Sequence, residues 1–282
     1  NNGGGVYVNG GTLTDCSVYG NDSGSAGPGG VQIDAGAVLN CTITNNITGW
    51  NSTSGGGIYV AGGVVSNCLI RANTGGAPSS NDARGGGVYQ TGGLVANCEI
   101  AANQGHKRGG GIYQAGGTLR NTLLDGNYAF EGGGGIHLTA GAVENCTVTG
   151  NYSEMIGGGG VWMSGGTVSN TISYFNVGEN LAQSGGAVEY SCVTPLPAAG
   201  AGNLDADPMF VDDEGGDYRL SLLSPCADTG TNQTWMSATV DLDGQPRVGN
   251  AVVDMGAYER QLTPGGALKC DFHATPVSGV IS

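Results

Sequence analysis

The sequence is poor in charge, and above all in positive charge. Only 11% of its 282 residues are Asp, Glu, Lys or Arg, and 23 acidic residues outnumber nine basic ones. A net charge of −14 argues against binding to nucleic acid or to anionic membrane surfaces, because both attract basic proteins. No apolar run approaches the length of about 18 residues that a membrane-spanning helix needs, so we expect no membrane span.

Glycine is abundant where charge is scarce. The chain contains 57 Gly residues, yet 39% of its residues are hydrophobic and the mean hydropathy is −0.07, which argues against disorder. Collagen is excluded because the Gly residues do not recur at every third position. So much Gly with so little charge indicates a repeated backbone geometry.

A repeat aligned on a Gly-Gly-Val/Ile step runs through most of the chain. Each unit contains a Gly run, an apolar-x-apolar triplet, a Gly turn, a second strand around Asn-Cys-x-Val/Ile, and a closing Asn. The units begin at Val6, Val31, Ile58, Val88, Ile112, Ile136 and Val161, with a degenerate eighth at Ala187. Short β-branched strands broken by Gly do not form helices. The pattern predicts an all-β parallel β-helix (solenoid) of about 8–10 coils over residues 1–204.

Two positions of the coil are rows of Asn. The first row is Asp15, Asn40, Asn67, Asn97, Asn121, Asn145 and Asn170, and the second is Asn21, Asn46, Asn73, Asn103, Asn127, Asn151 and Asn176. Stacked Asn side chains at a corner tolerate left-handed backbone and link their amides to the coils above and below. We therefore interpret both rows as structural.

Cysteine follows the same period. Cys16, Cys41, Cys68, Cys98 and Cys146 share one coil position, which Thr122 and Thr171 occupy in other coils. Stacked side chains stay further apart than the Cβ separation of about 3.5–4.5 Å in a disulfide, so we expect free, buried thiols. Cys192, Cys226 and Cys270 lie outside this row. One pair among these three can form a disulfide, and the sequence leaves open which.

The outward position of the first strand is a row of rings: Tyr7, Tyr59, Tyr89, Tyr113, His137 and Trp162, with Gln32 in the second coil. Insertions flank this row at 22–30, 47–57, 74–87, 104–111, 128–135, 152–160 and 177–186. Two interpretations are open. The rings form a carbohydrate-binding platform, because insertions in a solenoid commonly map to its binding face, or they only stabilise neighbouring strands.

No catalytic pattern stands out. A polysaccharide lyase needs a calcium-binding carboxylate cluster and a basic residue, and a hydrolase needs carboxylates that converge on adjacent coils. The candidate acids fall at different repeat offsets; they are Asp34, Glu99, Asp125 and Glu144. The basic cluster His106-Lys107-Arg108 is typical of a solvated loop. We expect no catalytic residues, with a lyase or hydrolase as the less favoured alternative.

The composition changes after Tyr190. Five blocks follow in order: Asp205-Ala-Asp-Pro-Met-Phe-Val211, Gly216-Asp-Tyr-Arg-Leu220, Ser224-Pro-Cys-Ala-Asp228, Asp241-Leu-Asp-Gly-Gln-Pro-Arg247 and Asp254-Met-Gly-Ala-Tyr-Glu259. They resemble the end module of choice-of-anchor Q proteins, which are bacterial right-handed β-helix surface proteins. The coils resemble, more loosely, the repeats of chlamydial polymorphic outer-membrane proteins. The resemblance implies a right-handed β-helix at the cell surface or secreted, with residues 205–260 as its C-terminal capping segment.

Aspartates of this segment lie beside Gly or turn residues, where a carboxylate accepts backbone N–H groups. They are Asp228, Asp241, Asp243 and Asp254, and we expect Arg219 and Arg247 to be their partners. Asp241 and Asp243 are also the candidate ligands of a calcium loop. Val252 stands where such a loop has its twelfth-position Glu, so we expect no metal and no cofactor.

Residues 261–282 are a third part. Thr263-Pro-Gly-Gly266 is a predicted linker, and the stretch from Cys270 to Ser282 resembles the first strand of a PKD domain, an immunoglobulin-like sandwich. Because Asn1-Asn2-Gly3-Gly4-Gly5 begins in mid-repeat, we expect an open first coil. The expected partners are other copies or adjacent domains, joined through this coil and the C-terminal strand.

These features predict a non-catalytic extracellular module with a structural or adhesive role, assembling head-to-tail into a filament or matrix. The alternative is an adhesin that binds polysaccharide through the ring row.

Overall fold

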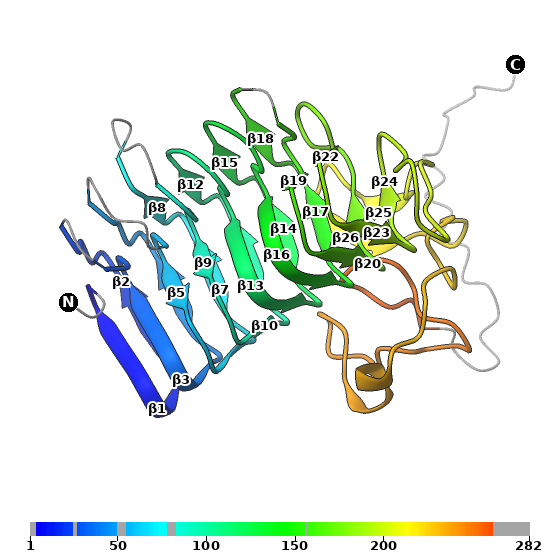
Figure 1. Ribbon diagram of the computed structural model, residues 1–282. Helices are drawn as coiled ribbons and strands as arrows, with labels where there is room; N and C mark the ends of the chain where they lie inside the picture. The colour runs from blue at the N-terminus through cyan, green and yellow to red at the C-terminus, as the bar shows by residue number, and fades with distance from the viewer. Residues whose placement is uncertain (1–3, 25–26, 50–54, 78–82, 156, 262–282) are drawn as a thin grey trace, which may run out of the picture.

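The computed structural model describes residues 4–24, 27–49, 55–77, 83–155 and 157–261. In this part of the chain, strands stack in parallel into a solenoid, as predicted, and helical structure is confined to one short 3₁₀ turn, η1 (Thr234–Ala238). Figure 1 shows the coils following one another from the N-terminus to β24. The predicted linker and the PKD-like strand lie outside the described residues. No helix found in the described part is long and apolar enough to cross a membrane.

The first face of the solenoid is a 12-stranded sheet with two strands per coil, separated by a Gly turn or fused into one long strand. Its strands are β1 (Val6–Thr14), β3 (Val31–Leu39), β5 (Ile58–Val60), β6 (Val64–Ser66), β9 (Val88–Gln90), β10 (Leu94–Ala96), β13 (Ile112–Arg120), β16 (Ile136–Glu144), β19 (Val161–Met163), β20 (Thr167–Ser169), β22 (Leu181–Gln183) and β23 (Ala187–Glu189).

The second face is an eight-stranded sheet to which each coil contributes one strand, so eight coils can be followed in the described part of the chain. Its strands are β2 (Ser17–Tyr19), β4 (Thr42–Thr44), β7 (Leu69–Arg71), β11 (Glu99–Ala101), β14 (Leu123–Asp125), β17 (Thr147–Thr149), β21 (Ile172–Ser173) and β24 (Cys192–Val193). The third face has four short strands: β8 (Thr74–Gly75), β12 (Gln104–Gly105), β15 (Tyr128–Ala129) and β18 (Tyr152–Ser153).

The core is one column of aliphatic side chains inside the coils. The predicted register is confirmed, since Val31, Ile58, Val88, Ile112, Ile136 and Val161 pair in succession and are fully buried. Parallel strands at this spacing place each inward side chain on the equivalent one in the next coil. The periodic apolar positions of the sequence therefore build a single continuous core.

The start of the eighth coil at Ala187 was wrong. Leu181 pairs with Val161, whereas Ala187 pairs with Thr167 on the second strand of the coil. Gly185 and Gly186 form the turn within the coil. A side chain at either position would place its Cβ against the backbone of the turn in coil seven. The predicted insertion 177–186 is consequently not a loop, because β22 lies within it. The eighth coil lacks the Gly run that precedes the first strand of the other coils, and its predicted start is therefore shifted to the turn.

The two Asn rows divide the predicted roles between them. All seven residues of the first row have positive φ, between 46° and 55°. In the second row, each amide bonds to the next coil: Asn73 Nδ2 donates to Asn103 Oδ1 (3.0 Å), and Asn103 Nδ2 donates to Asn127 Oδ1 (3.0 Å). Each Oδ1 also accepts the backbone N–H of the Asn one coil earlier, as Asn103 Oδ1 does from Asn73 (2.9 Å). Both rows are structural.

The five row cysteines are free, as predicted, and they do more than fill space. Cys68 Sγ donates to the carbonyl oxygen of Ser66 (3.2 Å), and Cys98 Sγ donates to that of Ala96 (3.1 Å). Thr122 Oγ1 donates in the same way to Arg120 O (2.8 Å). This shared bond to the carbonyl two residues earlier explains why Cys and Thr exchange at this position.

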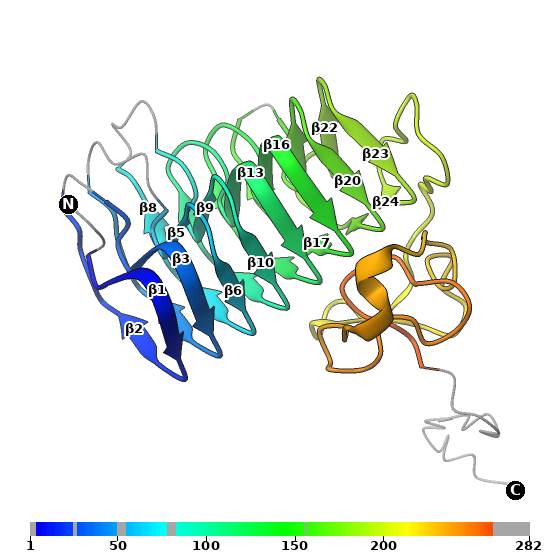
Figure 2. The same ribbon diagram turned by 60° about the horizontal axis from the view of Figure 1, so that its bottom comes forward.

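The segment 205–260 packs along the side of the solenoid, as Figures 1 and 2 show, instead of across its last coil. It contains the hairpin β25 (Phe210–Asp212) and β26 (Asp217–Leu220), followed by η1. Four successive Asn of the first row donate from Nδ2 to its carbonyl oxygens, at 2.9–3.2 Å. These donors are Asn97, Asn121, Asn145 and Asn170. We call residues 205–261 the lateral cap.

The last coil is closed by a different segment, residues 194–204. The backbone N–H of Val193 donates to Leu204 O (2.8 Å), and Leu204 N–H donates to Ser191 O (2.9 Å). Tyr190 N–H donates to Ala201 O (2.7 Å). Backbone groups of Tyr190, Ser191 and Val193 are thus paired before the lateral cap begins.

Candidate functional site

The predicted ring row lies on the outer surface of the 12-stranded sheet. The strand pairings align its members in register, coil by coil. The row is Tyr7, Gln32, Tyr59, Tyr89, Tyr113, His137 and Trp162. It ends at Ala182, which takes the ring position in the eighth coil.

The rings contact one another closely, and their mutual orientation changes along the row. The Tyr113 and His137 rings are stacked with centroids 4.8 Å apart, and the His137 and Trp162 rings are stacked at 4.1 Å. Tyr89 meets Tyr113 edge-to-face at 5.4 Å. Within the stacked part the ring faces are covered by their neighbours, as the strand-stabilising interpretation expects, so the row presents mainly ring edges outward.

Access to the rings also varies along the row. Tyr113 is only 6% exposed and His137 only 4%, whereas Tyr59, Tyr89 and Trp162 are half-buried. Tyr7 is 39% exposed and donates from its hydroxyl to Asp34 Oδ2 (2.8 Å). A ligand therefore meets Trp162 more readily than the two rings stacked behind it.

A hollow of about 600 Å³ opens beside the stacked end of the row. The rings of Tyr113, His137 and Trp162 line it. Arg108, Glu131 and Met155 line it from the insertion loops. Thr139 lines it from β16, and Ser164 lines it from directly after β19. Aromatic and thioether surface thus lies beside a few hydrogen-bonding groups, the composition typical of small-molecule sites. We call this the ring hollow.

The charges at the ring hollow are paired across coils. Glu131 forms ion pairs with Lys107 and with Arg108, whose Nε lies 3.3 Å from a Glu131 oxygen. The hydrogen bond from Lys107 lowers the pKa of Glu131, which is therefore ionised and unsuited to donate a proton near neutral pH. Arg84 lies over the Tyr113 ring, 5.1 Å from its centroid.

His137 is held neutral in this setting. Burial first, and then the positive charge of Arg108, lowers its pKa to about 4. Its Nδ1 is buried without a hydrogen-bond partner. A neutral imidazole packs between two rings at a lower desolvation cost than an imidazolium would.

The sequence named the rings of the hollow but not its polar groups. The sequence pattern predicts a solvated basic loop at Arg108 and assigns no role to Glu131 or Thr139. A signal was present, because Lys107 and Glu131 are opposite charges one coil apart, at the shortest repeat spacing of 24 residues. Coil-period charge pairs mark loops that pack on one another.

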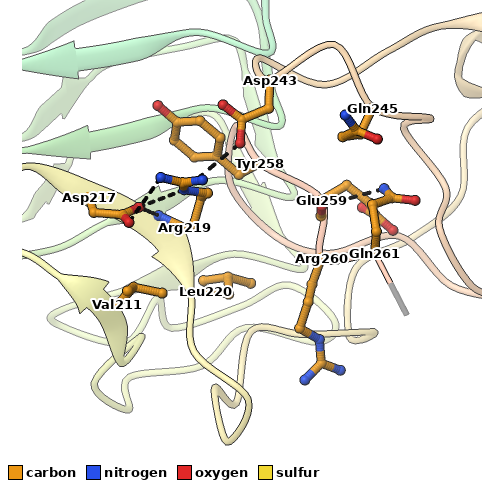
Figure 3. Close-up of a pocket in the computed structure, with 10 residues that line it drawn as sticks. All are labelled: Val211, Asp217, Arg219, Leu220, Asp243, Gln245, Tyr258, Glu259, Arg260 and Gln261. Atoms are coloured by element: carbon orange, nitrogen blue, oxygen red, sulfur yellow. Dashed lines mark hydrogen bonds and ion pairs between the residues drawn. The ribbon is translucent and has the colours of Figure 1, made fainter. Parts of the chain in front are cut away.

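A second cavity, of about 580 Å³, lies in the lateral cap. Figure 3 shows Arg219 in its wall between Asp217 and Asp243. Arg219 Nε donates to Asp217 Oδ1 (2.8 Å) and lies 3.9 Å from Asp243 Oδ2. Gln261, the last described residue, forms part of its wall. Because Arg219 is already paired with two carboxylates, we do not assign this cavity a ligand.

The cap carboxylates only partly follow the expectation. Asp241 and Asp254 each accept two backbone N–H bonds at 2.6–2.7 Å, as predicted. Arg247 pairs instead with Glu259 (3.4 Å), and Arg219 pairs mainly with Asp217. Asp241 faces the cap interior while Asp243 faces Arg219, so the two do not converge as a calcium loop requires. No group of three or more metal-ligating side chains occurs in the described part of the chain.

Comparison with known proteins agrees with this architecture. The family model for the right handed beta helix region matches residues 2–177, which is more than half of the chain. The match ends where the Gly run disappears and the eighth coil departs from the repeat. No curated protein and no solved structure matches the chain.

Proposed function

The chain belongs to the right-handed β-helix family, and we propose that it is a non-catalytic polysaccharide-binding module of a secreted or cell-surface protein. The fold itself is compatible with a surface or structural module. The specific proposal depends on one observation, the hollow beside Tyr113, His137 and Trp162.

The ring hollow suits a sugar for two reasons. The half-buried Trp162 ring and the exposed Met155 offer apolar surface to the C–H groups of a pyranose. The hydroxyls of Thr139 and Ser164, with the Arg108–Glu131 ion pair, offer both donors and acceptors to its hydroxyl groups. A ligand that is both apolar and rich in hydroxyls uses both sets at once.

The row also favours a polymer over a free sugar. Half-buried Tyr59 and Tyr89 continue from the hollow along the solenoid axis, one ring per coil. Several weak contacts in line raise the affinity for a chain that engages them together. The surface or secreted location is supported by the five C-terminal blocks that resemble choice-of-anchor Q proteins.

The chemistry of the hollow supports binding without catalysis. Glu131 is its lining carboxylate, and Lys107 and Arg108 both hold it ionised. A glycoside hydrolase pairs an ionised carboxylate with a second, protonated one. Incubation with pectin- and alginate-like polymers tests the alternative, since new reducing ends or ultraviolet-absorbing unsaturated products would contradict the non-catalytic assignment.

The proposal is tested by retention of the protein on a panel of insoluble and immobilised polysaccharides. We expect Trp162→Ala to weaken retention on the preferred polymer at least about tenfold, or about 1.4 kcal/mol. Trp162→Phe keeps an apolar ring and should retain most of the binding. Tyr19→Ala is the matched control, because Tyr19 is a 69% exposed ring on the second face.

Two results would sink the proposal. Absence of retention of the unmodified protein on every polymer removes polysaccharide binding altogether. Equal loss of retention in Trp162→Ala and Tyr19→Ala shows that binding does not depend on the hollow. Thermal melting of each variant confirms that the fold is intact before retention is compared. Head-to-tail assembly stays a prediction of the sequence.

A further inference from the structure

The eighth coil shifts its cysteine by one residue. In the other coils the row position is Cys or Thr, whose side chain donates to the carbonyl two residues earlier. Here Ser191 takes that position, and its Oγ donates to Glu189 O (2.9 Å), as Cys146 Sγ does to Glu144 O (3.3 Å). Cys192 follows on β24 and pairs with the outward Ile172 of coil seven. Its thiol is therefore directed out of the solenoid.

The lateral cap covers this thiol with another one. Cys192 and Cys226 are both fully buried and belong to one apolar cluster with Ile172, Leu220 and Met255. Cys192 Sγ donates to Ala206 O (3.0 Å), and the neighbouring Cys226 thiol, with burial, raises the pKa of Cys192 above its usual range. Two sulfur atoms 34 residues apart in sequence thus meet at the junction of cap and coil.

The backbone holds both positions in place. Cys192 N–H donates to Thr171 O (2.9 Å) within the stack, and Cys226 N–H donates to Ser224 Oγ (3.2 Å). Met255 N–H donates to Cys226 O (3.0 Å). The row cysteines are spaced by whole coils, which keeps their Cβ atoms about one strand spacing apart, beyond the usual range of a disulfide.

We propose that Cys192 and Cys226 form a disulfide bond that fastens the lateral cap to the last coil. The oxidant is an external disulfide. The Cys192 thiolate attacks one of its sulfur atoms and releases one thiolate, and Cys226 then attacks the mixed disulfide at Cys192 and releases the second. Two protein thiols lose two protons and two electrons, and the external disulfide is reduced to two thiols. The bond forms before the cap closes, while both sulfur atoms are accessible.

The bond is tested on the unmodified chain, so no variant has to fold. Protein refolded in the presence of glutathione disulfide is denatured with N-ethylmaleimide, either directly or after reduction, and its intact mass is measured by mass spectrometry. We expect six of the eight cysteines to be labelled without reduction and all eight after it. Peptide mapping should recover one linked pair, Cys192 with Cys226.

A second measurement tests the fastening. Reduction should increase the rate of proteolytic cleavage within residues 205–260 at least tenfold, while the coils stay protected. In Cys192→Ser and in Cys226→Ser, reduction should leave the cleavage rate unchanged, whereas Cys146→Ser in the row should behave as the unmodified chain. Eight labels without reduction, a linked peptide that joins other cysteines, or cleavage insensitive to reduction would each overturn the proposal.

Discussion

The coil stack and the lateral cap bury polar groups by opposite means. In the stack, a buried Asn bonds to the same residue one coil away, and the pattern repeats along the axis. In the cap, buried Arg247 lies among Asp241, Asp254 and Glu259, each held by backbone N–H groups. An amide carries a donor and an acceptor, so it can satisfy its own copy, whereas a carboxylate repels its copy.

This difference explains where the charge is found. Stacking places equivalent side chains about 4.8 Å apart, so a repeated charge would face its own sign in every coil. The coils therefore use Asn, Thr and Cys at buried polar positions. Buried charges of opposite sign are concentrated in the cap, which has no period and sets Arg247 against Glu259. Cap and stack should consequently respond differently to mutation and to pH.

The largest effect should follow from breaking the amide row with Asn103→Ala. The change removes the acceptor of the buried Asn73 N–H and a second acceptor of Asn73 Nδ2, which keeps only Ile43 O, and it removes a donor to Ile70 O. We expect a loss of about 4 kcal/mol in the free energy of unfolding, measured by urea denaturation. Asn67→Gly is the control, because Asn67 has φ 55° at the other corner and should lose less than about 1 kcal/mol. Similar losses in both variants would contradict the division between the two rows.

The cap should lose stability as the pH rises. Burial first, and then the Asp254 carboxylate, raises the pKa of Glu259 to about 7 from an ordinary value of 4.5. The folded cap keeps this proton after the unfolded chain has released it. Between pH 4.5 and 7 the cap should therefore lose up to about 3 kcal/mol. Urea denaturation monitored in the cap measures the loss, and Glu259→Gln should abolish this pH dependence. A cap that is equally stable at both pH values would refute it.

The ring hollow should respond in the opposite direction. The pKa of His137 is about 4 in the folded protein and 6.5 in an unfolded chain, so the folded state resists protonation. Its contribution to stability is complete above pH 6.5 and falls by up to about 3 kcal/mol as the pH drops to 4. Denaturation of His137→Gln should show a shallower loss on acidification. Parallel pH profiles for variant and unmodified protein would argue against a neutral, desolvated imidazole.

The smallest effect should come from exchange within the cysteine row. Cys68→Thr keeps the donor to Ser66 O and reproduces the residue type of Thr122, so stability should change by less than about 1 kcal/mol. Cys68→Ala removes that donor and should cost about 1–2 kcal/mol. Thermal unfolding of the pair measures the difference. If Ala were tolerated as well as Thr, the side-chain donor would have no role.

Much of the coil stack could be predicted from residue spacing. The inward column, both Asn rows, the free cysteines and the alignment of the ring row all follow from one period, because parallel stacking converts equal sequence spacing into contact. The start of the eighth coil could not be predicted from spacing, because Gly185-Gly186 resembles the Gly run at the start of a coil but forms the turn within one. The rings of the hollow could be predicted, but its polar groups could not, since they come from loops whose lengths vary.

Sequence alone determined the architecture and the repeated contacts of this protein, because equivalent positions of a repeat align with one another when the coils stack in parallel. The tertiary structure decided what the aperiodic parts do. It placed the lateral cap along the side of the solenoid, on Asn97, Asn121, Asn145 and Asn170, and not across the end of the last coil. It also brought Cys192 to Cys226, two residues related by no period. Such contacts depend on the path that the aperiodic segment takes through the folded protein, and local residue spacing does not determine that path.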